Sequence, residues 1–405
     1  MSVSKSFRWI DGRIALVLAT ALAVPAGAAT AEEKVLDTLQ MHGFLSQALV
    51  ITDDNNVFGP SSDGGGSLKY TEIGANASIR PHENVLVAAQ ILSRRAGGDG
   101  DDAAPSLDYG LVDYQMISNQ QRTLGIQLGR FKNPFGFYNQ TRDVAFTRPS
   151  ILLPQSIYFD RTRSLGLSGD GVSLYFEEMM PSGTFTTQVG IGKAQAGDDL
   201  RRTMRLENAP GELEPQDSAI GQIKYEHDGG RIVAALSAAS AQAKFESHDT
   251  TLNDGNFDFV PWVASLQYNA EHWSLTGEYA IRKSKLEGFD NPFLNFDVTG
   301  ESWYLQYARR FKDDWQWLVR YDSLTSNRDD PDGEAYEASG AGPAHSQYAD
   351  DITLGLQWNV NPRLMLAAEY HHVDGTGWLP IQDNPDPSDT DRHWNMLLFQ
   401  LSLRF

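Results

Sequence analysis

Apolar and polar residues alternate with a period of two along most of this chain. Between positions 273 and 282, Trp273, Leu275 and Tyr279 fall on one face of an extended strand, and Ser274 and Glu278 fall on the other. Side chains of a β-strand point alternately to opposite faces, whereas a helix repeats about every 3.6 residues. Helical periodicity is scarce after residue 31, so the pattern predicts a chain built of strands. The same alternation recurs in segments 219–226, 301–310, 315–323 and 351–359.

The number and length of these segments predict a large barrel. We count about sixteen, each close to the roughly ten residues that a tilted strand needs to cross a bilayer. Their centres lie near Ser46, Ala75, Ala89, Val112, Ile126, Leu174, Val189, Ile223, Leu236, Ala264, Gly277, Leu305, Val319, Leu354, Leu366 and Leu401.

The connections between the predicted strands alternate in length. Seven are short turns, such as Asp228-Gly229 and Asn361-Pro362, and eight are long polar loops, such as 194–216 and 326–347. A transmembrane barrel has this asymmetry, with short periplasmic turns and long extracellular loops. The pattern therefore predicts an all-β fold: a transmembrane antiparallel β-barrel of about 16 strands, with both termini on the short-turn side.

A large soluble β-sandwich would also place an apolar face on each strand. Two features favour the membrane barrel instead. Trp and Tyr lie near the ends of the apolar faces, as in the aromatic girdle at a membrane interface. The opposite faces carry charged residues in strand after strand, which suits a water-filled lumen better than a packed core.

The N-terminal segment has the features of an export signal. Lys5, Arg8 and Arg13 precede an apolar run at 14–24, and small residues follow. That run is too short to span a membrane and fits a secretory signal peptide, with cleavage between Ala28 and Ala31. A buried helix of the mature fold is the alternative, and the basic flank argues against it. The predicted domains are a signal peptide at 1–31 and an outer-membrane barrel at 32–405.

Composition narrows the partners further. The chain of 405 residues has a formal net charge of −20 and contains no cysteine. The strong negative charge argues against nucleic acid as a partner. A cysteine-free chain is compatible with export into an oxidising compartment.

The last residues form a strand that ends on an aromatic side chain. Leu397, Phe399, Leu401 and Leu403 share one face with the terminal Phe405. This ending resembles the C-terminal signal of Gram-negative outer-membrane barrels, which the barrel-assembly machinery reads. The resemblance implies that this machinery is a partner of the chain and that the outer membrane is its location.

Strand count, turn asymmetry and C-terminal ending together resemble outer-membrane porins across essentially the whole mature chain. Within this class, the run "LGRFKNPFGFYNQTRDVAFTRPS" resembles the phosphate-selective (porin O/P-like) group, on residues Gly129 to Gly136. The porin resemblance implies a third long loop, at about 133–168, that folds into the barrel and narrows the channel. It also implies a homotrimer.

Basic residues in and beside this loop are candidates for the constriction. A barrel of sixteen strands leaves an aqueous channel unless something fills it, and positive side chains at a narrow point favour anions. An alternative role is to hold the loop in place by pairing with Asp143, Asp160 and carboxylates of the barrel wall. The candidate constriction residues are Lys132, Arg142, Arg148, Arg161 and Arg163.

Charged residues of both signs lie on the predicted lumen faces of the strands. A mixed set of this kind predicts mild ion selectivity, and no basic ladder that would indicate phosphate specificity is visible along the strands. The predicted lumen-lining residues are Glu72, Lys224, Glu226, Glu278, Arg282, Arg320, Asp322 and Glu369.

Other chemistry finds little support in the sequence. His371 and His372 are adjacent on a predicted strand and point to opposite faces, which disfavours a shared metal. The acidic runs 327–334 and 383–391 lack the spacing of a calcium loop and predict solvated loops, or contacts with divalent cations that bridge lipopolysaccharide. No catalytic motif stands out, and we expect neither an enzyme nor a cofactor.

The function that fits these features is an outer-membrane porin for passive diffusion of small hydrophilic solutes, with a mild anion preference. Two alternatives stay open. One is a substrate-specific channel for phosphate, organic anions or sugars. The other is a barrel without transport, serving as a structural protein or adhesin.

Overall fold

The computed structural model describes residues 35–97, 103–248, 252–291 and 294–405. The predicted signal peptide at 1–31 lies outside the described residues. Within these ranges, seventeen strands form one sheet. The strands are β1 (Gln40–Thr52), β2 (Ser67–His82), β3 (Val85–Ala96), β4 (Ser106–Ser118), β5 (Arg122–Lys132), β6 (Ser168–Met180), β7 (Gly183–Ala194), β8 (Gly211–Pro215), β9 (Asp217–His227), β10 (Ile232–Ser247), β11 (Gly255–Asn269), β12 (Trp273–Glu287), β13 (Phe296–Phe311), β14 (Trp315–Thr325), β15 (Tyr348–Asn361), β16 (Leu364–Gly375) and β17 (His393–Arg404).

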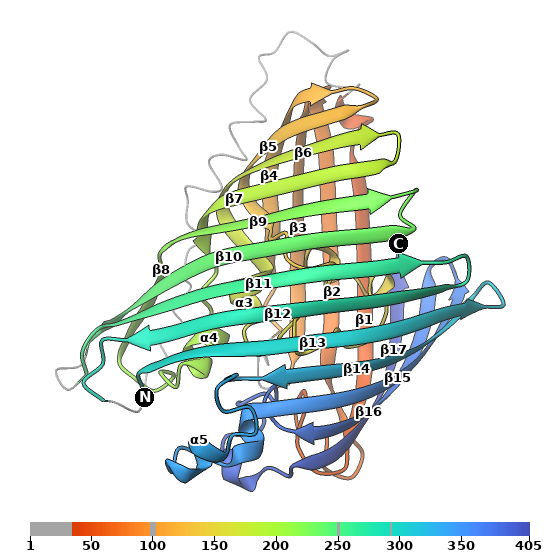
Figure 1. Ribbon diagram of the computed structural model, residues 1–405. Coiled ribbons are helices and arrows are strands. Elements are labelled where there is room, and N and C mark those ends of the chain that lie inside the picture. The colour runs from red at the N-terminus through yellow and green to blue at the C-terminus, as the bar shows by residue number, and fades with distance from the viewer. Residues whose placement is uncertain (1–34, 98–102, 249–251, 292–293) are drawn as a thin grey trace, which may run out of the picture.

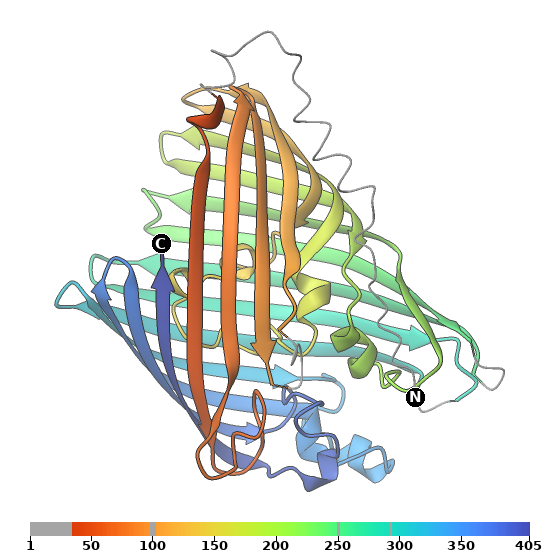
Figure 2. The same cartoon turned by 180° about the vertical axis from the view of Figure 1, so that it is seen from behind.

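The sheet closes into a barrel because its first and last strands pair. β1 and β17 run antiparallel, from Phe44 opposite Arg404 to Thr52 opposite Met396. β8 and β9 both pair with β10 and are separated only by Gln216, so they act as one interrupted strand. Sixteen strand positions therefore surround the barrel, and Figures 1 and 2 show its steeply tilted strands. The predicted antiparallel transmembrane barrel is confirmed, and each predicted centre lies within a strand.

The two faces of the wall differ sharply. Outward positions carry apolar side chains open to the surroundings, among them Trp262, Leu305 and Ile352. The intervening positions point inward and are polar and buried, as Thr276, Ser302 and many of the charged residues described below are. This arrangement is that of a barrel with lipid outside and polar groups inside. Among the described residues, no helix is both long and apolar enough to cross a membrane.

The two ends of the barrel also differ. Short turns close one end; Asp228, Lys312 and Asp313 have positive φ there, as tight hairpin turns require. Longer loops occupy the other end, where Figure 1 shows α4 and α5. These loops contain η1 (Asn139–Thr141), η2 (Ala145–Thr147), α3 (Arg163–Leu167), α4 (Asp198–Thr203), α5 (Glu334–Ala338), η3 (Ala344–Gln347) and η4 (Pro387–Asp389).

Candidate functional site

The segment between β5 and β6, residues 133–167 and called L3 below, lies inside the barrel. Figure 2 shows its coil behind β1, β2 and β3. Its Ile151 and Leu152 are buried in an apolar cluster that includes Trp394 of β17. Its Leu153 and Tyr158 pack in a second cluster with Val263, Ala280 and Tyr304 of β11, β12 and β13. L3 therefore contacts well-separated parts of the wall and narrows the lumen between them.

The base of L3 is held by ion pairs. The Lys132 ammonium, at the end of β5, bonds the carboxylates of Asp108 on β4 and Asp143 within the loop. Arg163, at the start of α3, bonds the same Asp143. Burial alone would raise the pKa of Asp143, but Arg163 and Lys132 outweigh it and lower that pKa below its ordinary value of 3.8. The two ends of the loop are thus tied to one ionised carboxylate.

A second group of ion pairs joins the middle of L3 to β2 and β3. Arg142 donates to the Tyr158 carbonyl at 3.0 Å and to Asp160 at 3.3 Å. Arg94 on β3 bonds Asp160 at 2.9 Å. Burial, and then the like charge of Arg163, lower the pKa of Arg142 to about 10, so it remains protonated at neutral pH.

Arg148 makes a direct bond to the wall. Its Nη2 donates to Glu72 of β2 at 2.8 Å, and both side chains are buried, at 4% and 1% exposure. Glu72 also accepts from Arg94 at 3.3 Å. This short network leaves neither the arginines nor the carboxylate free of a counter-charge.

Three wall carboxylates accept hydrogen bonds from the backbone of L3. Glu278 on β12 accepts from the Phe137 N–H at 3.0 Å, and Asp322 on β14 accepts from the Ser156 N–H at 3.4 Å. Glu369 on β16 accepts from the N–H groups of both Ile151 and Leu152. Carboxylates that the sequence suggested as channel lining therefore hold the loop as well. Glu278 further accepts from the hydroxyls of Tyr158, Tyr304 and Ser265, at 2.6, 2.9 and 2.5 Å.

Basic wall residues bond the same loop. Arg282 on β12 donates to the Ser156 carbonyl at 2.7 Å, and Arg320 on β14 donates to the Ser150 hydroxyl at 3.0 Å. Lys224 and Glu226 on β9 behave differently. They pair with each other at 2.7 Å and are about a third exposed, with no described bond to L3.

Arg161 stands apart from the other loop arginines. Its Nη1 donates to the Gly377 carbonyl at 3.0 Å, and no carboxylate among the described residues pairs with it. The Thr203 hydroxyl, at the end of α4, donates to the Arg161 carbonyl at 3.3 Å. Burial and the nearby charge of Arg205 lower the pKa of Arg161, and Tyr336 partly opposes this. Two arginines from different loops thus repel each other, and within the described residues neither pairs with a carboxylate.

The loop that carries Arg205, residues 195–210, also folds inward. Its Leu200, Met204 and Leu206 are buried in an apolar cluster with Phe245, and Asp199 accepts from the Ser164 N–H of L3 at 2.8 Å. Its composition predicted a long polar loop. The i, i+4 spacing of Leu200 and Met204 was the signal of a short amphipathic helix.

His371 and His372 lie on opposite faces of β16. His371 is buried and contacts Asp351 at 2.8 Å and Glu369 at 3.3 Å, whereas His372 contacts Asn395 on the exposed face. Over the described part of the chain, no group of three or more His, Cys, Asp or Glu side chains is arranged to hold a metal ion.

No protein-family model matches the sequence, and no curated protein matches it either. Several solved structures share its fold. The anion-selective porin from Comamonas acidovorans matches with a TM-score of 0.55 at 13% identity, over 91% of this chain and 99% of that chain. The outer membrane channel DcaP of Acinetobacter baumannii gives 0.53 at 11% identity, over 91% and 97%. The trimer form of OmpT, an outer membrane protein of Vibrio cholerae, gives 0.53 at 10% identity, over 91% and 99%.

These likenesses identify the architecture. The chain has the porin fold of Gram-negative outer-membrane proteins, with a closed barrel and an apolar outer face that match the predicted location. The resemblance to porins is confirmed at this level.

Proposed function

We propose that this chain is an outer-membrane porin that passes small hydrophilic solutes by passive diffusion. The observation that carries the proposal is the closed sixteen-position barrel whose L3 crosses a polar interior and bonds β2, β12, β14 and β16. A barrel of this width holds an aqueous channel, and a loop fixed across it sets the size limit.

Conductance of the purified protein in planar bilayers tests this function. We expect stepwise, ohmic channel openings in potassium chloride and exclusion of large sugars in a liposome-swelling assay. An inserted, folded barrel that conducts no ions would contradict the proposal and favour a structural protein or adhesin.

The mild anion preference is a narrower proposal and rests on Arg161 and Arg205. Lys132, Arg142, Arg148 and Arg163 have carboxylate partners, so their fields are largely neutralised locally. We propose that these four shape the constriction, while Arg161 supplies most of its uncompensated positive field.

Reversal potentials in a potassium chloride gradient test this division of roles. We expect Arg161→Gln to move the anion-to-cation permeability ratio by about twofold towards cations, since it removes one unneutralised charge near the channel. Arg130→Gln is the matched control, because Arg130 pairs with Asp170. An unchanged ratio in Arg161→Gln would refute the assignment.

A channel selective for phosphate is the second candidate, and the run from Gly129 to Gly136 favours it through its resemblance to that group. Saturable conductance that inorganic phosphate blocks at low concentration would support it. We also propose that the chain forms a homotrimer and contacts lipopolysaccharide. The assembly machinery recognises its Phe405 ending.

A further inference from the structure

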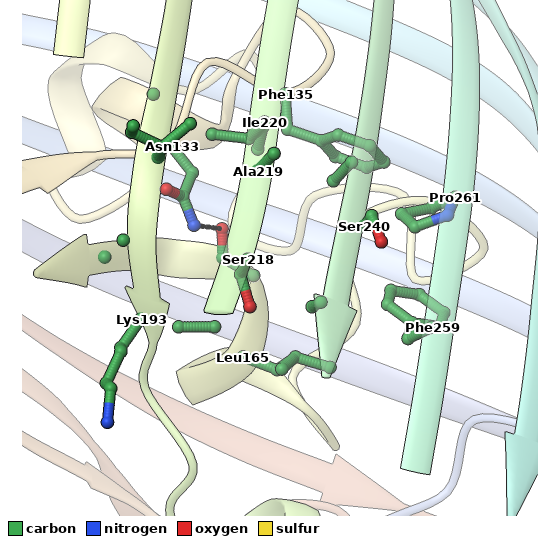
Figure 3. A pocket seen from close by; sticks show the side chains of 18 of the residues that line it. Asn133, Phe135, Leu165, Lys193, Ser218, Ala219, Ile220, Ser240, Phe259 and Pro261 are labelled. Carbon is green, nitrogen blue, oxygen red and sulfur yellow. Dashed lines mark hydrogen bonds between the residues drawn. The ribbon is translucent and has the colours of Figure 1, made fainter. Parts of the chain in front are cut away.

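An apolar cavity lies between the base of L3 and the barrel wall. It has a volume of about 70 Å³ and is bordered by the inward faces of β7, β9, β10 and β11. Figure 3 shows Phe135 and Leu165 of L3 with Ile220, Phe259 and Pro261 of the strands around it. L3 leaves the wall and returns to it at this point, since the Asn133 amide donates to the Gly166 carbonyl at 3.1 Å.

Small residues keep this cavity open. Gly190 on β7 makes room for the Phe131 ring at the edge of the cavity, since a Cβ there would lie 2.5 Å from that ring. Ala239 and Ala241 of β10 border the same space, and Ala239 is directly opposite Ile220 of β9. Larger side chains at these inward positions would fill the space that the aromatic rings leave.

The cavity is apolar although it adjoins a polar lumen. Of its polar neighbours, Asn133 bonds Gly166 and the Ser218 hydroxyl donates to the Gln216 carbonyl at 3.1 Å, whereas Lys193 and Ser240 lie exposed at its border. A water molecule needs two to four polar partners, and the side chains of Phe135, Leu165 and Ile220 offer it none. The space therefore favours an apolar group over water.

Its position places the cavity on the lumen side of the wall. Val189, Leu236 and Trp262 are about half exposed on the outer face. Gly190, Ile220 and Ala239, which border the cavity, alternate with these outward positions, and the exposed Ile191 and Ser240 also border it. A solute that passes L3 thus meets a polar channel and, beside it, an apolar recess.

We propose that this recess is a binding subsite for the short branched alkyl group of a permeating solute. Its volume is about half of the ~150 Å³ cavity known to bind benzene, so it fits an isopropyl or isobutyl group better than an aromatic ring. The solute's polar part stays in the lumen water. The inference rests on the proposed porin function, and it predicts that branched-chain solutes are retained while their straight polar counterparts pass freely.

Isovalerate and acetate are suitable probes, because both are monoanions and only isovalerate carries an isobutyl group. In planar bilayers of zwitterionic lipid at constant ionic strength, we expect isovalerate to reduce the chloride current saturably. Its half-maximal concentration should be at least tenfold below that of acetate, as expected for burial of two or more carbons at about fourfold each. Equal action of the two probes would overturn the proposal.

Ala239→Leu tests the location, because it fills the cavity. We expect isovalerate to act like acetate on this variant, while the chloride conductance alone changes less than twofold. Ala238→Leu is the matched control: Ala238 is the next residue of β10 and is opposite the outward Trp262. Retained isovalerate sensitivity in folded Ala239→Leu would refute the site.

Xenon binding separates failure of the subsite from failure of the porin function. In crystals of the full protein under xenon pressure, we expect density between Ile220 and Phe259, and none there in Ala239→Leu. This measurement needs no conductance, so a barrel that does not conduct still tests the cavity. An unoccupied cavity in the wild type would overturn the proposal.

Discussion

Arg148 and Arg161 show how different two arginines of one loop can be. Arg148 is buried against Glu72 and has a counter-charge at 2.8 Å. Arg161 bonds only a carbonyl and lies near another arginine. A buried charge that loses its partner is strongly destabilising, whereas a charge without a counter-charge beside a channel acts on passing ions. We therefore assign stability to the first residue and ion preference to the second.

Glu72→Gln should destabilise the protein by about 3–5 kcal/mol, because it leaves Arg148 buried without a full counter-charge. The free energy of unfolding in urea, measured in lipid vesicles, checks this. Glu178→Gln is the control: its partner Arg122 is mostly exposed, so the loss should stay below about 1 kcal/mol. Equal losses in the two variants would contradict the buried pair.

Acidification should leave L3 in place until strongly acidic pH. Burial raises the pKa of Asp160, but Arg94 and Arg142 outweigh it and lower that pKa below 3.8, as the partners of Asp143 do for that residue. A carboxylate with a depressed folded-state pKa stabilises above its unfolded pKa and loses this effect only as pH falls through the folded value. These pairs hold L3, so we expect the channel conductance to stay constant from pH 7 down to about 4. In Asp160→Asn, the conductance should already differ from that of the wild type at neutral pH, and the change on acidification should be absent.

The strands were predictable and most of the loop contacts were not. Alternation between lipid-facing and lumen-facing positions is local, so a segment such as 273–287 reveals its own strand. The partner of Arg148 is Glu72, 76 residues away in the chain, and only barrel closure brings the two together. The sequence offered pairing with wall carboxylates as one of two roles, but it could not identify the partners.

The loop at 195–210 shows the same limit for an element. Composition made it look solvated, because charged residues surround Leu200 and Met204. Its burial depends on the apolar ends of β10, β11 and β12, which form a surface only after the strands align. The interruption between β8 and β9 likewise depends on pairing with β10.

L3 should become mobile when its wall contacts are weakened. In Glu278→Gln, one of the two carboxylate oxygens is replaced by an amide donor, so the bonds from Phe137, Tyr158 and Tyr304 cannot all persist. We expect a severalfold rise in open-channel current noise, measured in single-channel recordings. Glu226→Gln is the control, since Glu226 pairs with Lys224 and not with L3. Unchanged current noise in Glu278→Gln would contradict this expectation and show that the other contacts are enough to hold L3.

Aromatic residues are unevenly distributed around the outside of the whole molecule. β11 to β15 carry outward Trp and Tyr side chains, among them Trp262, Trp303 and Tyr321. The outward faces of β2 and β3 carry small or aliphatic residues, such as Ala75 and Ile91. Aromatic girdles mark lipid contact, so the β2–β3 face, with its small and aliphatic side chains, suits contact with another copy in the proposed trimer.

Ala77→Trp on β2 should therefore weaken the trimer, because a large ring would separate two closely packed barrels. Ala264→Trp on β11 places the same ring beside Trp262 and should have no effect. Molar mass in detergent, measured by light scattering, distinguishes the two. A monomeric wild type, or equal behaviour of both variants, would contradict this placement of the interface.

The pairing of β1 with β17 has a consequence for biosynthesis. These strands are separated by more than 340 residues of the chain, yet each supplies the hydrogen bonds that the other lacks. Until β17 is available, both ends of the sheet expose unpaired backbone groups, which attract other chains and cannot be hydrated in a membrane. A nascent chain that lost its last dozen residues would have every other strand and still no closed wall. Closure of the barrel therefore requires the final strand. With it, the preceding residues form a membrane protein, and without it they are a substrate for proteolysis.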